Sequence, residues 1–299
     1  MTIIIGVNGT SSGDDALVLG SLLAHCTGDD MIVAVVMPAA SGRGGPLWSL
    51  GRFAAMSGRA DEVLARAHAL TPADVRADFR AVPGRSAAGG LHALAEQVHA
   101  SLIVLGSTGR GPVGRVLAGG TAARLLSGSP APVAVAPREF RTQAPERLDQ
   151  ITAAYIDTPE GNVALDAAAA LARSVDTRLL VITVVPSPDL LVPPPAQPPM
   201  KEFVAGALDS AGEALDLAVA GLPPELVRAS EIIEADYVAA ALADLPDTQL
   251  LVCGSRAYGP LRRVLLGEVS SEVIRTAAYP VLVVPRGSDP TLSGHGPVG

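Results

Sequence analysis

The sequence predicts an α/β protein built from two tandem domains, each a doubly wound parallel sheet with helices on both faces. Short apolar runs rich in β-branched residues alternate with helix-like runs along the chain. Those runs are nearly continuous in their apolar character, which is typical of strands covered on both faces. A glycine motif occurs twice, at Leu105-Gly106-Ser107-Thr108-Gly109 and again from Gly254, 148 residues further on. The repeat indicates a duplicated domain.

The first half predicts a regular alternation of strands and helices. The predicted strands are residues 2–7, 31–37, 75–82, 102–105 and 133–136, and the predicted helices are residues 16–25, 57–70, 87–99 and 121–126. Residues 8–13 and the Gly- and Pro-rich residues 39–51 are predicted loops. Asp14 or Asp15 is expected to start the first helix, because a carboxylate suits the exposed N–H groups of a first turn.

The second half predicts the same order of elements. Its predicted strands are residues 151–156, 178–185, 227–233, 250–252 and 281–284, and its predicted helices are residues 162–173, 201–219 and 237–245. Residues 186–199 carry five prolines within 193–199 and are predicted to be a surface loop. The domains are therefore placed at residues 1–139 and 150–287. A polar linker is expected at 140–149 and a disordered tail at 288–299.

Composition excludes several classes of protein. The 299-residue chain is 48% hydrophobic and 17% charged, which favours a packed core over disorder. A net charge of −8 argues against sequence-independent nucleic-acid binding. We expect no membrane span, because no 18-residue window is apolar throughout, and no signal peptide, so the expected location is the cytoplasm. Cys26 and Cys253 do not correspond between the repeats, which favours free thiols over a disulfide.

The glycine motif has two possible roles, phosphate binding and packing. Glycines between a strand and a helix allow backbone N–H groups to approach an anion, and the helix that follows presents unpaired N–H groups, so a phosphate is a natural ligand. Turns of this kind also occur for packing alone. The motif lacks Gly-Lys-Ser/Thr, which excludes a P-loop, and it follows the fourth strand, whereas the dinucleotide fingerprint Gly-x-Gly-x-x-Gly follows the first.

Several motifs agree in order with one known family. The spacing Gly106-x2-Gly109-x9-Gly119 resembles the ATP-binding pattern of the universal stress protein family. The loops at residues 5–10 and 155–161 and the closing Pro-Val-x-Val-x-Pro at 132–137 and 280–285 are similar to the same family. The resemblance covers residues 2–286 as two copies.

The resemblance implies a five-stranded parallel sheet in each domain, of the adenine nucleotide α-hydrolase-like type, with ATP at the strand ends and Mg²⁺ left open. It also implies that the closing strands join the two halves as a pseudo-dimer, or pair two chains as a homodimer. The nucleotide-contacting positions it implies are Gly6, Asn8, Val35, Gly106, Gly109, Gly119, Gly120 and Thr121 in the first half, and Asp157, Val184, Gly254, Ala257, Gly267 and Glu268 in the second.

Four of these positions depart from the family pattern. Asn8 replaces an acidic residue, and Gly120 replaces a Ser whose hydroxyl Thr121 is expected to supply. Ala257 adds a methyl group where backbone should approach phosphate, and Glu268 adds a negative charge. The first half is therefore predicted to bind ATP more tightly than the second.

No residues stand out as catalytic or metal-binding. The five histidines lack metal-ligand spacing, and no base and nucleophile form a recognisable pair. The leading hypothesis is an ATP-binding regulatory protein of the stress response, with slow ATP hydrolysis at most. The alternatives are a nucleotide-independent interaction scaffold, a weak ATPase, or a transferase or ligase of the wider adenine nucleotide α-hydrolase-like group.

Overall fold

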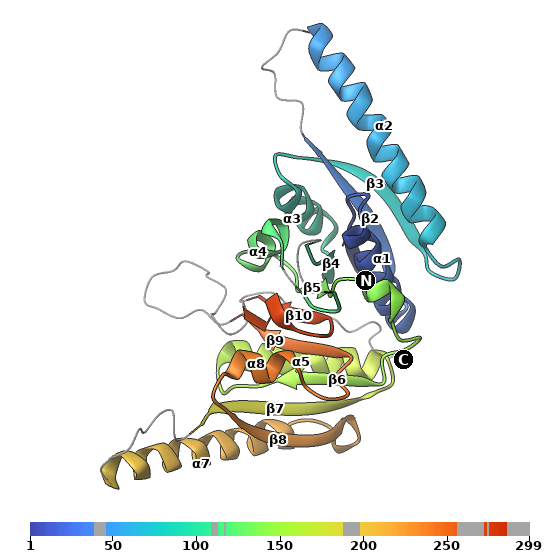
Figure 1. The fold of residues 1–299 in the computed structure, drawn as a ribbon. Helices are drawn as coiled ribbons and strands as arrows, with labels where there is room; N and C mark the ends of the chain where they lie inside the picture. Colours follow the sequence, from blue (N-terminus) through green and yellow to red (C-terminus); the bar gives the residue numbers. More distant parts are fainter. Residues whose placement is uncertain are drawn as a thin grey trace.

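The two halves of the chain build one continuous sheet. A computed structural model describes residues 1–38, 46–108, 113–116, 118–187, 198–255, 272–273 and 275–285. The strands follow the order β3-β2-β1-β4-β5-β10-β9-β6-β7-β8 (Figure 1). All neighbours are parallel except β5 and β10, so each half contributes a five-stranded parallel sheet, as predicted.

The first half contains strands β1 to β5 and helices α1 to α4. The strands are β1 (Thr2–Gly6), β2 (Asp30–Pro38), β3 (Ala77–Gly84), β4 (Leu102–Gly106) and β5 (Val133–Ala136). The helices are α1 (Ser11–Thr27), α2 (Pro46–Leu70), α3 (Ala87–Val98) and α4 (Gly120–Leu126), and a 3-10 turn η1 (Phe140–Thr142) follows β5.

The second half repeats this order. Its strands are β6 (Gln150–Ala154), β7 (Arg178–Pro186), β8 (Val227–Ala235), β9 (Leu250–Gly254) and β10 (Val281–Val284). Its helices are α5 (Pro159–Ser174), α7 (Pro198–Ala220) and α8 (Val238–Ala243), with a 3-10 turn η2 (Pro224–Leu226) before β8.

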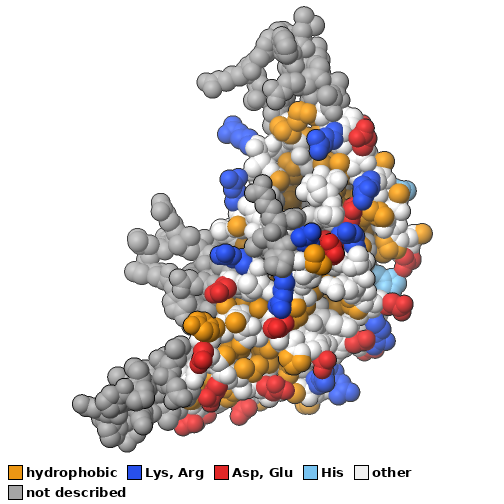
Figure 2. Space-filling model, in the orientation of Figure 1, with side chains coloured by type: hydrophobic (Ala, Val, Ile, Leu, Met, Phe, Trp, Pro, Cys, Tyr) orange, Lys and Arg blue, Asp and Glu red, His pale blue; other side chains and the backbone are white. Residues whose placement is uncertain are grey.

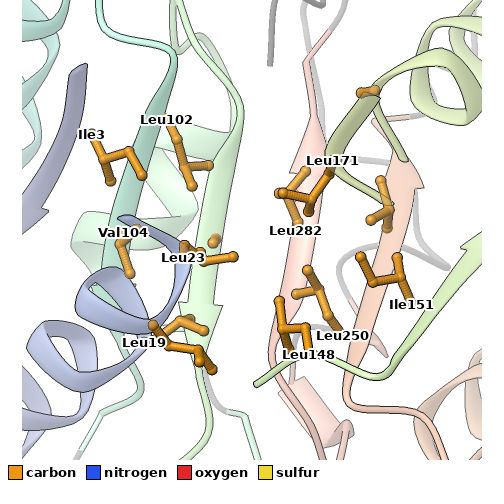
Figure 3. Close-up of a cluster of buried hydrophobic side chains, with 14 of the residues drawn as sticks. Ile3, Leu19, Leu23, Leu102, Val104, Leu148, Ile151, Leu171, Leu250 and Leu282 are labelled. Carbon is orange, nitrogen blue, oxygen red and sulfur yellow. The ribbon is translucent and has the colours of Figure 1, made fainter. Parts of the chain in front are cut away.

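Two apolar layers cover the sheet, one on each face. Ile3 and Ile5 of β1 pack on the side of α1 and α2, whereas Ile4 packs on the side of α3 and α4. This alternation is the two-residue period of a strand. It continues into the second half, where α5 and α7 share the layer of α1, and α8 shares the layer of α3. Figure 3 shows the first layer from both halves, with Leu23 and Val104 on one side and Leu171 and Leu282 on the other.

The halves meet through their closing strands. Leu282 of β10 lies opposite Ala134 of β5 in an antiparallel ladder, flanked by the pairs Val281–Val135 and Val283–Val133. All of these side chains are fully buried. Because β5 and β10 cover each other, neither leaves a free edge for another chain, and the outer edges of the sheet are β3 and β8.

Two predictions about local structure were wrong. Helix α2 begins at Pro46, inside the predicted loop 39–51, because proline is well suited to the first turn of a helix. Helix α1 begins at Ser11 with Thr10 as its N-cap, so neither Asp14 nor Asp15 starts it. The predicted linker also carries two buried apolar residues, Phe140 and Leu148. The domain boundaries themselves stay a prediction, and most of the predicted loop 186–199 and the whole predicted tail lie outside the described residues.

Candidate functional site

A cleft of about 680 Å³ opens at the carboxyl ends of β1, β2 and β4. The order of the first-half strands reverses at this point. Strands β2 and β3 lie on one side of β1, and strands β4 and β5 lie on the other side. Open α/β sheets bind ligands at such a switch point. The lining residues include most of the first-half positions singled out from sequence: Gly6, Asn8, Val35, Gly106, Gly119, Gly120 and Thr121. Gly109 lies outside the described residues.

The apolar end of the cleft lies where β2 ends. Val35, Val36 and Met37 follow one another along this strand, and Met56 of α2 also lines the cleft. Val35 is 9% exposed and keeps part of its surface toward the opening. A flat aromatic base would bury apolar area against such a wall.

Polar and small residues line the cleft beyond the end of β4. Thr108 follows β4, and Gly119 and Thr121 flank the start of α4. A Cβ at Gly119 would lie 2.7 Å from the Thr108 Cγ2 atom, so glycine is needed there for close approach. A Cβ at Gly120 would meet nothing within 4 Å, so the backbone at this position faces open space.

Gly106 serves packing as well as lining the cleft. A Cβ at this position would lie 1.9 Å from the Ser12 carbonyl oxygen, in the first turn of α1. The same contact occurs in the second half, where a Cβ at Gly254 would lie 2.8 Å from the Glu160 carbonyl oxygen in α5. In both halves, therefore, glycine lets the helix after the first strand approach the end of the fourth.

Asn8 presents a hydrogen-bond donor to the cleft. Its Oδ1 atom accepts from the Thr10 backbone N–H at 3.1 Å and from the Thr10 hydroxyl at 2.7 Å. The amide nitrogen remains available to a ligand. The family's carboxylate would keep a second oxygen as an acceptor, so the Asn changes the chemistry of this position from accepting to donating.

The carboxylates of Asp14 and Asp15 in α1 are hydrogen-bonded to other residues of the chain. Asp14 accepts two bonds from Arg66 of α2, at 2.6 and 3.1 Å. Asp15 is 1% exposed and accepts from the backbone N–H groups of Glu139 and Arg141 and from the Arg141 guanidinium, at 2.8 to 3.1 Å. These long-range bonds replace the predicted helix-capping role, and they leave neither carboxylate lining the cleft.

Arg59 is the one charged side chain among the described residues that line the cleft. It lies on α2, one turn before Val63, and it also lines an adjoining groove with Asn8 and Gly9. Sequence reasoning did not select it, because an Arg on an amphipathic helix looks like an ordinary solvated residue. Its spacing of four from Val63, which the structure shows to be buried, places the two residues one turn apart on the same side of the helix.

The strand register corrects the correspondence between the two halves. Ile3 pairs with Leu102 and Ile151 pairs with Leu250, an offset of 148 in both cases. The N-caps Thr10 and Thr158 keep the same offset. The counterpart of Asn8 is therefore Ile156.

Asp157 and Val184, predicted as the equivalents of Asn8 and Val35, are thus shifted by one residue. They correspond to Gly9 and Val36, and the counterpart of Val35 is the buried Thr183. Burial of the hydroxyl and the neighbouring Asp157 carboxylate together raise the pKa of Tyr155. Ala257, Gly267 and Glu268 lie outside the described residues.

The glycine-rich loop of the first half is the stretch between β4 and α4, residues 107–119. Two of its residues, Arg115 and Val116, are hydrogen-bonded to the second half. The Val116 amide donates to the Ala277 carbonyl at 2.7 Å, and Val116 is fully buried. The Arg115 guanidinium donates to the carbonyl of Thr276 at 3.0 Å and pairs with Asp244 at 3.3 Å. These residues are more than 120 positions apart and meet only in the folded chain, so no local sequence pattern could predict their contacts.

The geometry defines a duplicated α/β protein with a cleft at the switch point of its first half. The sequence pattern described as "Universal stress protein family" matches residues 1–137 and 148–285. A universal stress protein of Mycobacterium tuberculosis strain H37Rv is 31% identical over 297 residues, covering 95% of this chain and 100% of the relative. The chain belongs to the universal stress protein family.

Solved structures agree on the fold. A putative universal stress protein from Pseudomonas aeruginosa UCBPP-PA14 superposes with a TM-score of 0.63 at 19% identity, covering 95% of this chain and 92% of the other. One from Archaeoglobus fulgidus superposes with a TM-score of 0.60 at 18% identity, covering 96% of each chain. Among the described residues, no helix has the length and apolar character needed to cross a bilayer.

Proposed function

We propose that this chain is a cytoplasmic regulatory protein that binds ATP in the first-half cleft and hydrolyses it slowly or not at all. The observation that carries the proposal is the polarity of the cleft. An apolar wall at the end of β2 suits adenine, and the backbone at Gly119 and Gly120 with the Thr121 hydroxyl suits phosphates.

The cleft supports binding more than catalysis. Its described lining contains no Asp, Glu or His, so none of these groups stands ready to activate water. Asp14 and Asp15 are bonded to Arg66 and to the segment after β5. Mg²⁺ would be held through the phosphates of the bound nucleotide, because the described lining of the cleft contains no Asp or Glu.

We further propose that the second half binds nucleotide weakly. Ile156 stands where the first half has the donor Asn8, and Glu268 stands at the position of Gly120. Charge acts in the same direction. Residues 1–149 carry 13 basic and 12 acidic side chains, whereas residues 150–299 carry nine basic and 18 acidic ones. On the face in Figure 2, acidic side chains gather over the lower part, where the second half lies.

The proposed assembly is a pseudo-dimer within one chain. The β5–β10 ladder supplies the strand pairing that two separate chains would otherwise make, so we expect a monomer of 30.3 kDa by light scattering.

Isothermal titration with ATP tests the proposal, together with mass spectrometry of small molecules released from the purified protein. The expected result is one site per chain and little turnover. Two equal sites would contradict the proposed difference between the halves. Absence of binding would favour the nucleotide-independent scaffold, and rapid turnover would favour an ATPase.

A further inference from the structure

We propose that Arg59 is a specificity-determining residue that recognises a phosphate carried on the ribose of the bound nucleotide, at its 2′ or 3′ oxygen. This inference rests on the proposed adenine-nucleotide site and goes beyond it. It names a class of ligand, adenine nucleotides phosphorylated on the ribose, that the first-half cleft would prefer over nucleotides with free ribose hydroxyls.

The two ends of the cleft orient the nucleotide. The base is expected against Val35 and Met37 at the end of β2, and the 5′-phosphates against Gly119 and Thr121 beyond β4. Strand β1 lies between β2 and β4 in the sheet. The ribose, which joins base and 5′-phosphates, must therefore pass the residues that follow β1, where the polar residues Asn8, Thr10, Ser11 and Ser12 line the cleft.

Arg59 stands beside the same stretch. Arg59 lines both the cleft and the adjoining groove that contains Asn8 and Gly9, so it lies where the cleft and the groove meet. Helix α2 is held close at this point, because a Cβ at Gly9 would lie 2.7 Å from the Val63 Cγ2 atom. Arg59 therefore lies beside the residues that follow β1, where the ribose is expected.

The guanidinium is available for a ligand. Arg59 is exposed, and within the described part of the chain it makes no ion pair or hydrogen bond. Arg66, two turns further along α2, differs in this respect because Asp14 holds it in a two-bond contact. The nearby Glu62 lines the groove but not the cleft.

The chemistry around the ribose is that of an anion site. Asn8 offers only its amide N–H groups, since Thr10 occupies Oδ1. No carboxylate of the described lining is present to accept from ribose hydroxyls. In dinucleotide-binding folds an acidic residue at the ribose selects the free hydroxyl, whereas an Arg accommodates a ribose phosphate. Asn8 and Arg59 together reproduce the second arrangement.

The test compares AMP with adenosine 2′,5′-bisphosphate and adenosine 3′,5′-bisphosphate by isothermal titration, on the full chain. The wild type is expected to bind at least one bisphosphate roughly tenfold or more tighter than AMP, as a charge-assisted contact would give. Arg59→Gln is expected to remove this preference and to leave AMP affinity within about twofold. Arg85→Gln is the matched control, because Arg85 is also exposed near the carboxyl edge of the sheet but does not line the cleft.

The outcomes separate this inference from the proposed function. If ATP and AMP bind but the bisphosphates bind no better, Arg59 has no ribose-phosphate role and the ATP site stands. Equal weakening of ATP and bisphosphates in Arg59→Gln would place the guanidinium on the 5′-phosphates and overturn the inference. Loss of the preference in Arg85→Gln as well would reduce it to general surface charge. Binding of no adenine nucleotide would remove the proposed function itself. Unchanged thermal unfolding of both variants shows that folding is intact.

Discussion

The Val116 amide and the Ala277 carbonyl form a 2.7 Å hydrogen bond that joins the glycine-rich loop of the first half to the second half. The same loop contributes Gly119 to the cleft, three residues further along. A ligand that contacts Gly119 and favours this position of the loop would therefore also stabilise the contact between halves, and the contact would favour the ligand by the same free energy. If the proposed function holds, this linkage would give a bound nucleotide a physical route to a change that a partner protein can detect.

Arg115 provides the first test of that linkage. Arg115→Ala removes the donors to Thr276 and Ala243 and the ion pair with Asp244. We expect unfolding to become easier by about 1–2 kcal/mol, and ATP affinity to fall as well. Urea unfolding and titration calorimetry measure the two effects. Arg124→Ala, on the exposed side of α4, is the control and should change neither. An unstable variant with unaltered ATP affinity would show that the halves are not coupled through this loop.

Gly120 tests the proposed asymmetry between the halves. Gly120→Glu reproduces the Glu268 of the second half at a position where an added Cβ meets nothing within 4 Å. We expect ATP affinity to drop more than tenfold, because a carboxylate would face the phosphates, while the free energy of unfolding changes by less than about 0.5 kcal/mol.

The matched variant is Gly120→Gln, which has the same shape without the charge. It should retain most of the ATP affinity in the same titration. If Gln and Glu weaken binding equally, the effect is steric, and the charge of Glu268 loses its explanatory role.

Gly106 separates packing from ligand binding. Gly106→Ala forces a methyl group against the Ser12 carbonyl oxygen, which belongs to the backbone and cannot rotate away. We expect a destabilisation of about 2 kcal/mol or more even without nucleotide, seen in denaturant unfolding. Gly128→Ala, where a Cβ has open space, should be near neutral. A stable Gly106→Ala protein that no longer binds ATP would instead show that this glycine serves the ligand alone.

Local sequence predicted the strands well and the long-range contacts poorly. The strands β5 and β10 fall on the predicted residues, because buried parallel strands are compact β-branched runs. The partners of Asp15 are more than 120 residues away, and no local pattern can identify them.

The candidate site shows the same division. The glycines around β4 were recognisable by spacing, but Asp157 was chosen for its chemistry, and its place was decided by the strand register. Arg59 was missed because its role depends on where α2 crosses the cleft. The glycine spacing therefore predicted residues that line one cleft, and the backbone determined which other side chains lie beside them.

Tyr279 gives a prediction about pH, because its hydroxyl is buried at the contact between α8 and the second-half closing strand. It accepts from the Leu245 amide at 3.2 Å and donates to the Leu242 carbonyl. Burial raises its pKa from 10.0 to about 12, and the Asp244 charge acts in the same direction. Because the pKa is higher in the folded state, the Tyr279 hydroxyl loses its proton at a lower pH in the unfolded chain than in the folded chain. The stabilisation is complete below pH 10 and is lost as pH rises from 10 to about 12.

Tyr279→Phe removes both the hydrogen bonds and this pH dependence. Near pH 7 we expect a loss of about 1–3 kcal/mol, because the Leu245 N–H is left without its partner. The difference in unfolding free energy between wild type and variant should then shrink by roughly 2 kcal/mol as pH passes from 10 to 12. Urea titrations at several pH values measure it, and ionisation of the other tyrosines cancels in the difference. A wild-type-to-variant difference that stays constant over this range would mean that the Tyr279 hydroxyl ionises equally in the folded and unfolded chain.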